Sequence, residues 1–255
     1  MNDTLPAWKI GDSEAIGRYR TLLDVARFRR TSRAFDPDVP VPREHIEMIL
    51  EAVRHSPSGA NSQPWNFIVV TDGEKKAAIG DYFVNEASKR AKLKMKFPTP
   101  NYSGMKTAPG FIAVVADFRY VEAFPVLGDG SKLDRMYHDN ALRILLQSVA
   151  AATMAAHLAA AALGYGTWWV TAIGQEHAQN ELKPLLGVPD DLSVIDIMCF
   201  GKPVEEPYSR WKKDFDQVVS WETFDMDHYR TAEQVKAWIK ETRHKVMYKD
   251  EKQID

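Results

Sequence analysis

The sequence predicts one α+β domain over residues 1–255, and three observations support this class. Four short segments are rich in β-branched and aromatic residues, which is typical of strands. Longer segments with a helical spacing of apolar residues separate them. The chain has neither G-x-G-x-x-G after its first strand nor G-x-x-x-x-G-K-[ST], so the two commonest phosphate-loop architectures are excluded.

The predicted elements follow in order along the chain. Strands are predicted at residues 65–71, 110–116, 167–173 and 193–200. Helices are predicted at residues 15–28, 74–97, 139–163 and 176–186, after Pro42, and from about Thr231. After Pro42, apolar residues recur at the i, i+3, i+4, i+7 spacing of one buried helix face. Residues 117–137 are predicted to form an irregular connection.

The composition indicates an ordinary soluble chain. Of its 255 residues, 45% are hydrophobic and 27% are charged, and the formal net charge is -2. This charge balance is not basic enough to indicate a nucleic-acid partner. The single cysteine, Cys199, lies in an apolar run and excludes an intrachain disulfide. The seven histidines form neither H-E-x-x-H nor a Cys/His ligand set, so we expect no metal site.

The sequence also argues against a membrane segment. The first twenty residues lack the layout of a signal peptide. The longest apolar stretch, 141–163, is mostly alanine and contains Arg143, Gln147 and His157, which favours a buried helix over a bilayer span. We therefore expect a cytoplasmic protein.

Three patches suit a ligand site, although each has an ordinary structural interpretation. Residues 29–33, RRTSR, offer three guanidiniums and two hydroxyls to an anion, or form a basic surface turn. Residues 56–65, SPSGANSQPW, form a long polar loop between a helix and a strand, where ligand loops commonly lie. Residues 168–172, WWVTA, could wall an aromatic cofactor or form a plain buried strand.

Taken together, these patches resemble the nitroreductase family of FMN-dependent flavoproteins. The resemblance runs from RRTSRAF through SPSGANSQPWNFIVV, the alanine-rich stretch and LGYGTWWVTAIG to FGKPVEEP, covering most of residues 22–224. It implies a central, mostly antiparallel sheet flanked by helices and an intertwined homodimer that binds FMN at its interface. From the residues themselves, we expect either a substrate lid or a core-packing excursion at 98–137, and a C-terminal extension from about residue 220.

The resemblance assigns cofactor-binding residues position by position. Arg29, Arg30, Thr31 and Arg33 match the positions that hold the phosphate, the ribityl chain and the pyrimidine edge; Thr31 stands where the family usually has serine. The loop positions reached from the partner subunit are Pro57, Ser58, Gly59 and Asn61. Trp169 and Val170 match the strand beside the flavin, and Lys212 and Lys213 match a C-terminal basic turn that meets the phosphate.

Thr171 matches the residue that contacts flavin N5, and we expect it to tune the cofactor. Many nitroreductases have an acidic residue there, whereas iodotyrosine deiodinase-like members of the family resemble this chain in having threonine. A hydroxyl at N5 would favour one-electron steps, so a reductive dehalogenase is retained as an alternative function.

The activity implied by the resemblance is a ping-pong transfer of reducing equivalents from NAD(P)H, through FMN, to a small aromatic acceptor. A nitroaromatic or a quinone is the expected acceptor, and Tyr102, Tyr137 and Asn140 are candidate substrate contacts. The alternatives are a dehalogenase-like or flavin-degrading enzyme of the same fold, or a non-catalytic flavin carrier or sensor. The sequence does not choose between NADH and NADPH.

Overall fold

The computed structural model describes residues 10–93, 101–205 and 212–241. The chain divides into two compact units, Met1–Glu205 and Glu206–Asp255. The first unit contains all four strands, and the predicted C-terminal extension falls in the second.

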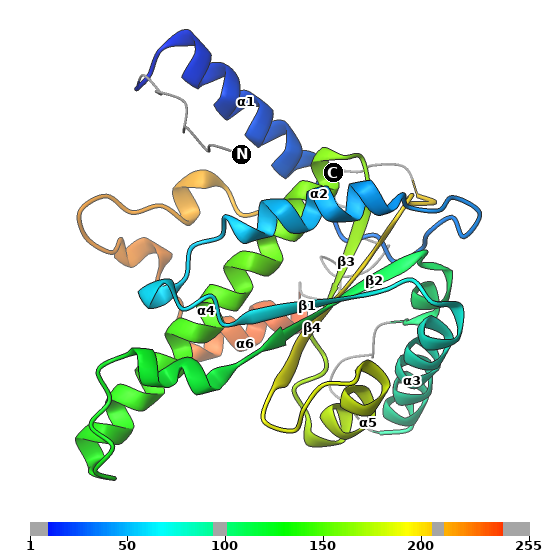
Figure 1. Ribbon diagram of the computed structural model, residues 1–255. Coiled ribbons are helices and arrows are strands. Elements are labelled where there is room, and N and C mark those ends of the chain that lie inside the picture. The colour runs from blue at the N-terminus through cyan, green and yellow to red at the C-terminus, as the bar shows by residue number, and fades with distance from the viewer. Residues whose placement is uncertain (1–9, 94–100, 206–211, 242–255) are drawn as a thin grey trace, which may run out of the picture. The chain divides into compact units, whose positions relative to one another are not determined.

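A four-stranded antiparallel sheet forms the centre of the first unit (Figure 1). Its spatial order is β1 (Trp65–Val70), β2 (Gly110–Ala116), β4 (Ser193–Gly201) and β3 (Gly166–Val170). Every residue of β2 is buried, because this strand is paired on both edges and covered on both faces. The predicted α+β class with a mostly antiparallel sheet is therefore confirmed.

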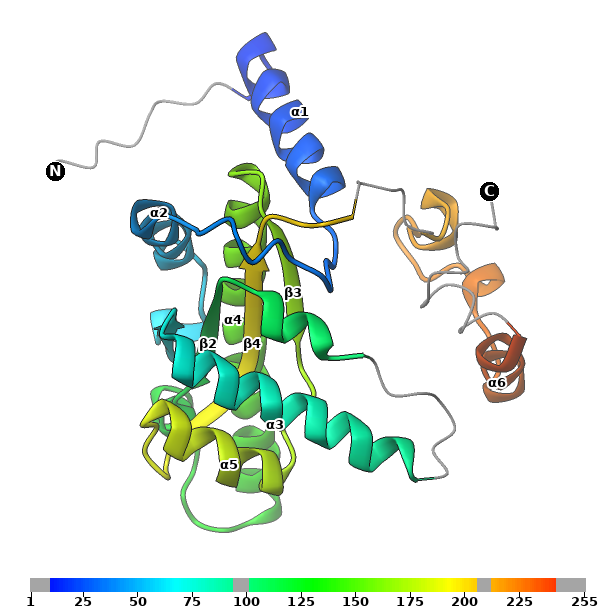
Figure 2. The ribbon, with the colours of Figure 1, turned by 90° about the vertical axis from the view of Figure 1, so that its right-hand side faces the viewer.

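Helices cover both faces of the sheet, as Figures 1 and 2 show. On one face, α3 (Gly73–Ala91) and α5 (Glu176–Leu186) pack on a core that includes Phe111, Trp168 and Ile197. On the other face, α2 (Arg43–Arg54) and α4 (Lys132–Ala162) pack on Ile112, Met198 and Phe200. Because neighbouring strand residues point to opposite faces, the alternating apolar residues of β2 and β4 supply both cores.

The long helix α4 is apolar and long enough to cross a membrane by length and composition. Half of its most apolar window is nevertheless buried inside the protein, and α4 packs against α2 and the sheet. Its alanines allow this close packing, and the predicted buried helix is borne out.

The bounds of most elements agree with the sequence-based expectations to within two residues, and those of three elements differ by more. Helix α4 begins at Lys132 and not at residue 139, because Ser131 caps it by accepting the Asp134 N–H at 3.0 Å. Strand β3 ends at Val170, three residues before the predicted end. Helix α3 ends at Ala91, and the last residues of the predicted helix lie outside the described residues.

The segment 98–137, expected as a lid, has several structural parts. Its first three residues lie outside the described residues, and the short helix Ser103–Thr107 and strand β2 are packed into the core. The short helix Phe118–Ala123 and the following turn connect β2 to α4. The lid role of residues 98–137 therefore stays a prediction.

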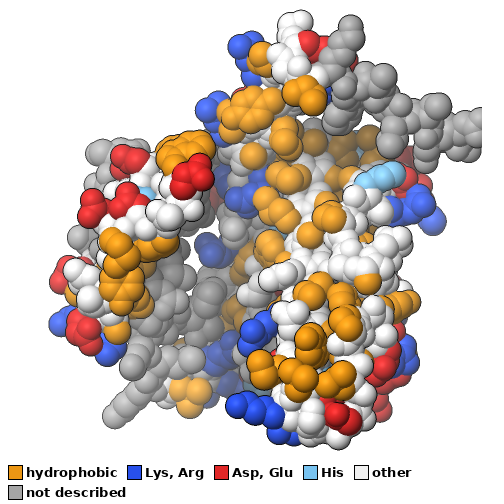
Figure 3. Space-filling view, turned by 90° about the vertical axis from the view of Figure 1, so that its left-hand side faces the viewer, with side chains coloured by type: hydrophobic (Ala, Val, Ile, Leu, Met, Phe, Trp, Pro, Cys, Tyr) orange, Lys and Arg blue, Asp and Glu red, His pale blue; other side chains and the backbone are white. Residues whose placement is uncertain are grey.

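Helix α1 (Ser13–Phe28) has no buried residue. Figure 3 shows hydrophobic side chains gathered on the face of the first unit that carries α1 and α4. The exposed members on these two helices are Ile16, Tyr19, Leu22, Leu133, Met136, Tyr137 and Leu146. A surface of this kind is typical of an interaction site.

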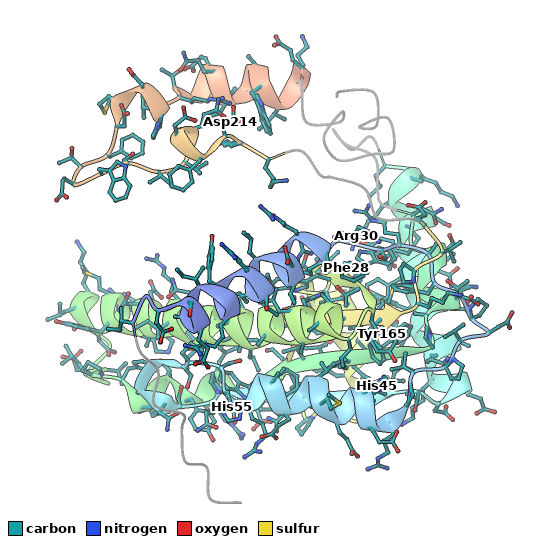
Figure 4. All side chains as sticks on the ribbon, turned by 90° about the horizontal axis from the view of Figure 1, so that it is seen from above. Phe28, Arg30, His45, His55, Tyr165 and Asp214 are labelled. Carbon is teal, nitrogen blue, oxygen red and sulfur yellow. The ribbon has the colours of Figure 1, made fainter. Side chains whose placement is uncertain are left out.

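The second unit contains two short 3₁₀ turns and α6 (Ala232–Glu241). Asp214, labelled in Figure 4, forms a capping box with Gln217 at the first turn. Phe215, Trp221 and Phe224 are among its exposed aromatic residues.

Candidate functional site

The basic segment at residues 29–33 lies along the first half of β3. Thr31 forms a parallel bridge with Thr167, and the Ser32 N–H donates to the Thr167 carbonyl at 2.8 Å. The Arg33 guanidinium carbon lies 5.8 Å from the centre of the Trp168 ring, within the range of a cation–π contact. The segment is thus held by a single β-bridge at a sheet edge.

Two glycines permit this close packing. A Cβ on Gly166 would lie 2.5 Å from the Ser32 Oγ, and one on Gly104 would lie 1.5 Å from the Arg33 carbonyl oxygen. Either side chain would force the basic segment to move, and at Gly104 the obstacle is backbone. The segment is therefore fixed between β3 and the short helix Ser103–Thr107.

The arginines of this segment differ in their surroundings. Arg30 is only 7% exposed, donates to the Phe28 carbonyl at 3.2 Å, and lies over the Phe28 ring (Figure 4). Arg29 is half-buried and Arg33 is exposed. Guanidiniums and hydroxyls on a fixed backbone suit phosphate oxygens, so this donor set fits the phosphate end of FMN.

A buried polar layer lies beneath β3, between this strand and α4. The His157 Nδ1 is 2.7 Å from the Thr167 Oγ1, and its ring stacks on Trp169 with centroids 5.1 Å apart. Burial, and then the charge of Arg29, lower the pKa of His157 to about 3, so the imidazole is neutral. Its Nε2 is buried without a hydrogen-bond partner.

The second part of this layer is a buried carboxyl. Asp196 on β4 is 4% exposed, and the Thr153 hydroxyl of α4 is 3.2 Å from its Oδ2. Burial raises the pKa of Asp196, while the nearby Trp169 and Thr153 side chains oppose that rise. The Trp169 Nε1 itself is buried and makes no hydrogen bond of normal geometry.

The loop at residues 56–64 has an unusual backbone. Ala60, Asn61 and Gln63 have φ values of 52°, 50° and 46°, in the left-handed region that residues other than glycine seldom adopt. The Gly59 N–H donates to the Ser148 Oγ of α4 at 3.1 Å. A Cβ on Gly59 would lie 2.2 Å from the Ile144 side chain, so glycine is needed for this contact. Such strain held in place by packing is typical of ligand-binding loops.

The two patches lie at opposite ends of the sheet within one chain. The loop leads into Trp65, which pairs with Ala116, whereas Gly166 pairs with Gly201 at the other end. Along α4, the loop contacts Ser148 and the layer under the basic segment contacts His157, nine residues further on. That separation corresponds to about 14 Å of helix. The structure therefore does not bring the two patches together in a single chain.

The remaining sequence-predicted residues are placed as follows. Trp169 and Val170 belong to β3, and Thr171 is exposed directly after its end. Pro57 and Asn61 are exposed on the loop, and Ser58 accepts a hydrogen bond from the Gln63 N–H at 3.0 Å. The flavin contacts of all of these stay predictions.

Two further groups of predicted residues lie elsewhere. Tyr102 is 6% exposed and stacks between Phe83 and Trp168 in the core. Tyr137 and Asn140 are exposed on α4. Lys212 and Lys213 are exposed in the second unit, whose position relative to the site is not determined. The substrate and phosphate roles of these residues stay predictions.

Sequence reasoning missed the supporting residues Gly104, Gly166 and His157. The only sequence signal for His157 is a histidine in an otherwise apolar helix, and Gly166 lies between a predicted helix and a predicted strand without any sign of a close contact. A hollow of about 390 Å³ lies between α3 and α5, lined by residues that include Tyr82, Glu86 and His177. It belongs to the face of the sheet opposite α4 and does not reach the basic segment.

Comparisons with known proteins show which family this chain resembles. The family model described as the Nitroreductase family matches residues 26–202. A provisionally named NADH dehydrogenase/NAD(P)H nitroreductase of Archaeoglobus fulgidus is 30% identical over 178 residues, covering 70% of this chain and 83% of that protein.

A second relative and a solved structure are also similar to this chain. The 5,6-dimethylbenzimidazole synthase of Rhodospirillum rubrum is 28% identical over 194 residues, covering 74% of this chain and 85% of that protein. The solved FMN-dependent nitroreductase of Clostridium difficile R20291 has a TM-score of 0.57 at 23% identity, covering 79% of this chain and 99% of that one. At this identity, the solved structure shows a shared fold.

Proposed function

Because this chain belongs to the nitroreductase family, we propose that it is an FMN-dependent oxidoreductase that passes reducing equivalents from NAD(P)H to a small organic acceptor. The observation that carries the proposal is the basic segment fixed along β3, which offers phosphate-binding donors beside a strand that could lie under a flavin. A nitroaromatic or a quinone is the acceptor class we favour.

In this proposal, Arg29 and Arg33 bind the FMN phosphate and pyrimidine edge, with Thr31 on the ribityl chain. Arg30 is fixed by Phe28 and holds the segment's shape. A cationic donor at the pyrimidine edge would stabilise negative charge on the ring. Trp169, Val170 and Thr171 would lie beside the flavin, with Thr171 at N5. Bound FMN would supply the redox chemistry, taking reducing equivalents from NAD(P)H and releasing them to the acceptor in a separate half-reaction.

We also propose that the site is completed by a second copy of the chain. The loop at 56–64 and the basic segment are too far apart to meet in one chain, and α1 and α4 expose apolar side chains. In a homodimer, the loop of one subunit would reach the basic segment of its partner, and the apolar face would be buried. Light scattering measures the molar mass of the purified protein in solution and so tests this proposal. A mass of two chains supports it, whereas a stable monomer that binds FMN would contradict it.

A second candidate function is a specialised enzyme of the same fold. The match to a 5,6-dimethylbenzimidazole synthase supports a synthase as one such enzyme, and Thr171 beyond the end of β3 retains a reductive dehalogenase as another. A flavin-degrading enzyme is a third alternative. A non-catalytic flavin carrier remains a further alternative.

Product analysis distinguishes these functions. The purified chain would be reconstituted with FMN, reduced with NADH or NADPH, and supplied separately with a nitroaromatic, a halogenated phenol and oxygen. Reduction of the nitroaromatic supports the main proposal. If only the halogenated phenol reacted and released halide, the dehalogenase would replace the main proposal. If only the flavin was broken down, the flavin-degrading enzyme would replace it.

A further inference from the structure

The structure assigns a positioning role to His157, a residue outside the basic segment. We propose that the His157 side chain, through Thr167, sets the position of residues 29–33 and thereby the preference of the site for a phosphorylated flavin. This inference rests on the proposed function, because it concerns the same anion site.

The first step of the argument is a continuous chain of contacts. The His157 Nδ1 is 2.7 Å from the Thr167 Oγ1, and Thr167 is the residue that pairs with the basic segment. Its carbonyl accepts the Ser32 N–H at 2.8 Å. A path of two hydrogen-bonded contacts therefore leads from the His157 imidazole through Thr167 to Ser32, the residue before Arg33.

The second step concerns what holds the imidazole. His157 is 2% exposed, and its ring is stacked on Trp169 of the same strand. Thr153, one helical turn before it on α4, contacts Asp196 on β4 at 3.2 Å. The ring therefore cannot turn away from Thr167 without disturbing a packed layer that spans α4, β3 and β4.

The third step is the cost of keeping a histidine at this position. Its Nε2 is buried without a partner, and a buried polar atom of this kind opposes folding. A leucine of similar size would fill the space in a helix that is otherwise rich in alanine and leucine. Packing alone does not account for the imidazole, whereas the hydrogen bond to Thr167 does.

The test compares the affinities of the full chain for FMN and for riboflavin, which lacks the phosphate. Dissociation constants for both would be measured by quenching of flavin fluorescence. The variants are His157→Leu, which removes both nitrogens, and Thr167→Val, which removes only the hydroxyl. A matched pair completes the set: the amide in His157→Asn occupies roughly the position of Nδ1, whereas the amide in His157→Gln occupies roughly that of Nε2.

We expect His157→Leu, His157→Gln and Thr167→Val to lower the preference for FMN over riboflavin by about five- to tenfold, the effect of one hydrogen bond between neutral groups. His157→Asn should keep the preference within about threefold of the original. Circular dichroism would show which variants fold, and Thr167→Val changes the volume of the core least.

Two results would overturn the inference. An equal loss of both flavins would mean that His157 only stabilises the fold, and an unchanged preference in Thr167→Val would break the chain of contacts. The unsubstituted protein serves as the check on the proposed function. If it bound FMN no better than riboflavin, the phosphate assignment of residues 29–33 would fail, and the inference with it.

Discussion

Gly104 packs directly against the backbone of Arg33, so that a Cβ on Gly104 would lie 1.5 Å from the Arg33 carbonyl oxygen. No side chain can be accommodated at that separation, and the obstacle is main chain that a rotamer change cannot relieve. Because Arg33 belongs to the segment that we assign to phosphate binding, the contact links a core residue to the site.

Gly104→Ala should therefore weaken FMN binding and lower the free energy of unfolding by about 1–3 kcal/mol, the usual cost of overpacking. Gly73→Ala is the matched control, because a Cβ on Gly73 meets nothing within 4 Å. Urea unfolding and FMN titration of both variants measure the two effects. Equal behaviour of the two variants would contradict the close packing.

Removing the guanidiniums should affect the phosphate more than the flavin ring. Arg29→Ala and Arg33→Ala should each weaken FMN binding by about tenfold or more, because a charge-assisted hydrogen bond contributes about 1.5–3 kcal/mol. Riboflavin binding should change much less for an arginine that contacts only the phosphate, because riboflavin lacks that group. Arg43→Ala on the exposed surface of α2 is the control. If either site variant purified with a full complement of FMN, that arginine would not hold the phosphate.

The buried carboxyl of Asp196 predicts a dependence of stability on pH. Burial raises its pKa above the ordinary value of 3.8, so the folded chain holds the proton more tightly than the unfolded chain does. The resulting stability is present at low pH and is lost as the pH rises through the raised value. Asp196→Asn cannot ionise and should therefore gain stability relative to the original protein as the pH rises from about 4 into the neutral range. A difference in unfolding free energy that stays constant over this range would contradict the prediction.

A hydrogen bond between His45 and Tyr165 ties α2 to the turn before β3. The His45 Nδ1 and the Tyr165 Oη are 2.6 Å apart, and Figure 4 shows both side chains. Tyr165→Phe should lower the free energy of unfolding by about 0.5–1.5 kcal/mol. Tyr229→Phe, which changes an exposed residue of the second unit, should leave it nearly unchanged. A similar loss in both variants would argue against a contribution from this bond.

Much of the first unit could be predicted because its signals are local. Strand β2 and helix α5 were predicted with their observed bounds, since an apolar run and a helix followed by Gly187 are visible in adjacent residues. The start of α4 was wrong because its cap, Ser131, lies among polar turn residues, and helical spacing becomes visible only further along. The early end of β3 has no such signal, because it depends on pairing with a distant strand: Val170 pairs with Ile197, and β4 continues from there to Ser193 against β2 only.

The candidate site was only partly predictable for the same reason. The composition of RRTSR pointed to an anion, but its pairing with Thr167 joins residues more than a hundred positions apart. The close approach at Gly104 and the layer around His157 likewise depend on tertiary packing. The loop at 56–64 was singled out by its residues, whereas its left-handed backbone at Ala60 was not foreseeable.

An absorbance experiment on the purified protein tests the central claim most directly. The protein, reconstituted with FMN, would receive NADH or NADPH without oxygen and then a nitroaromatic compound. We predict that the visible flavin bands fade with the nucleotide and return with the nitroaromatic. A protein that stays colourless and cannot be reconstituted with FMN would contradict the account.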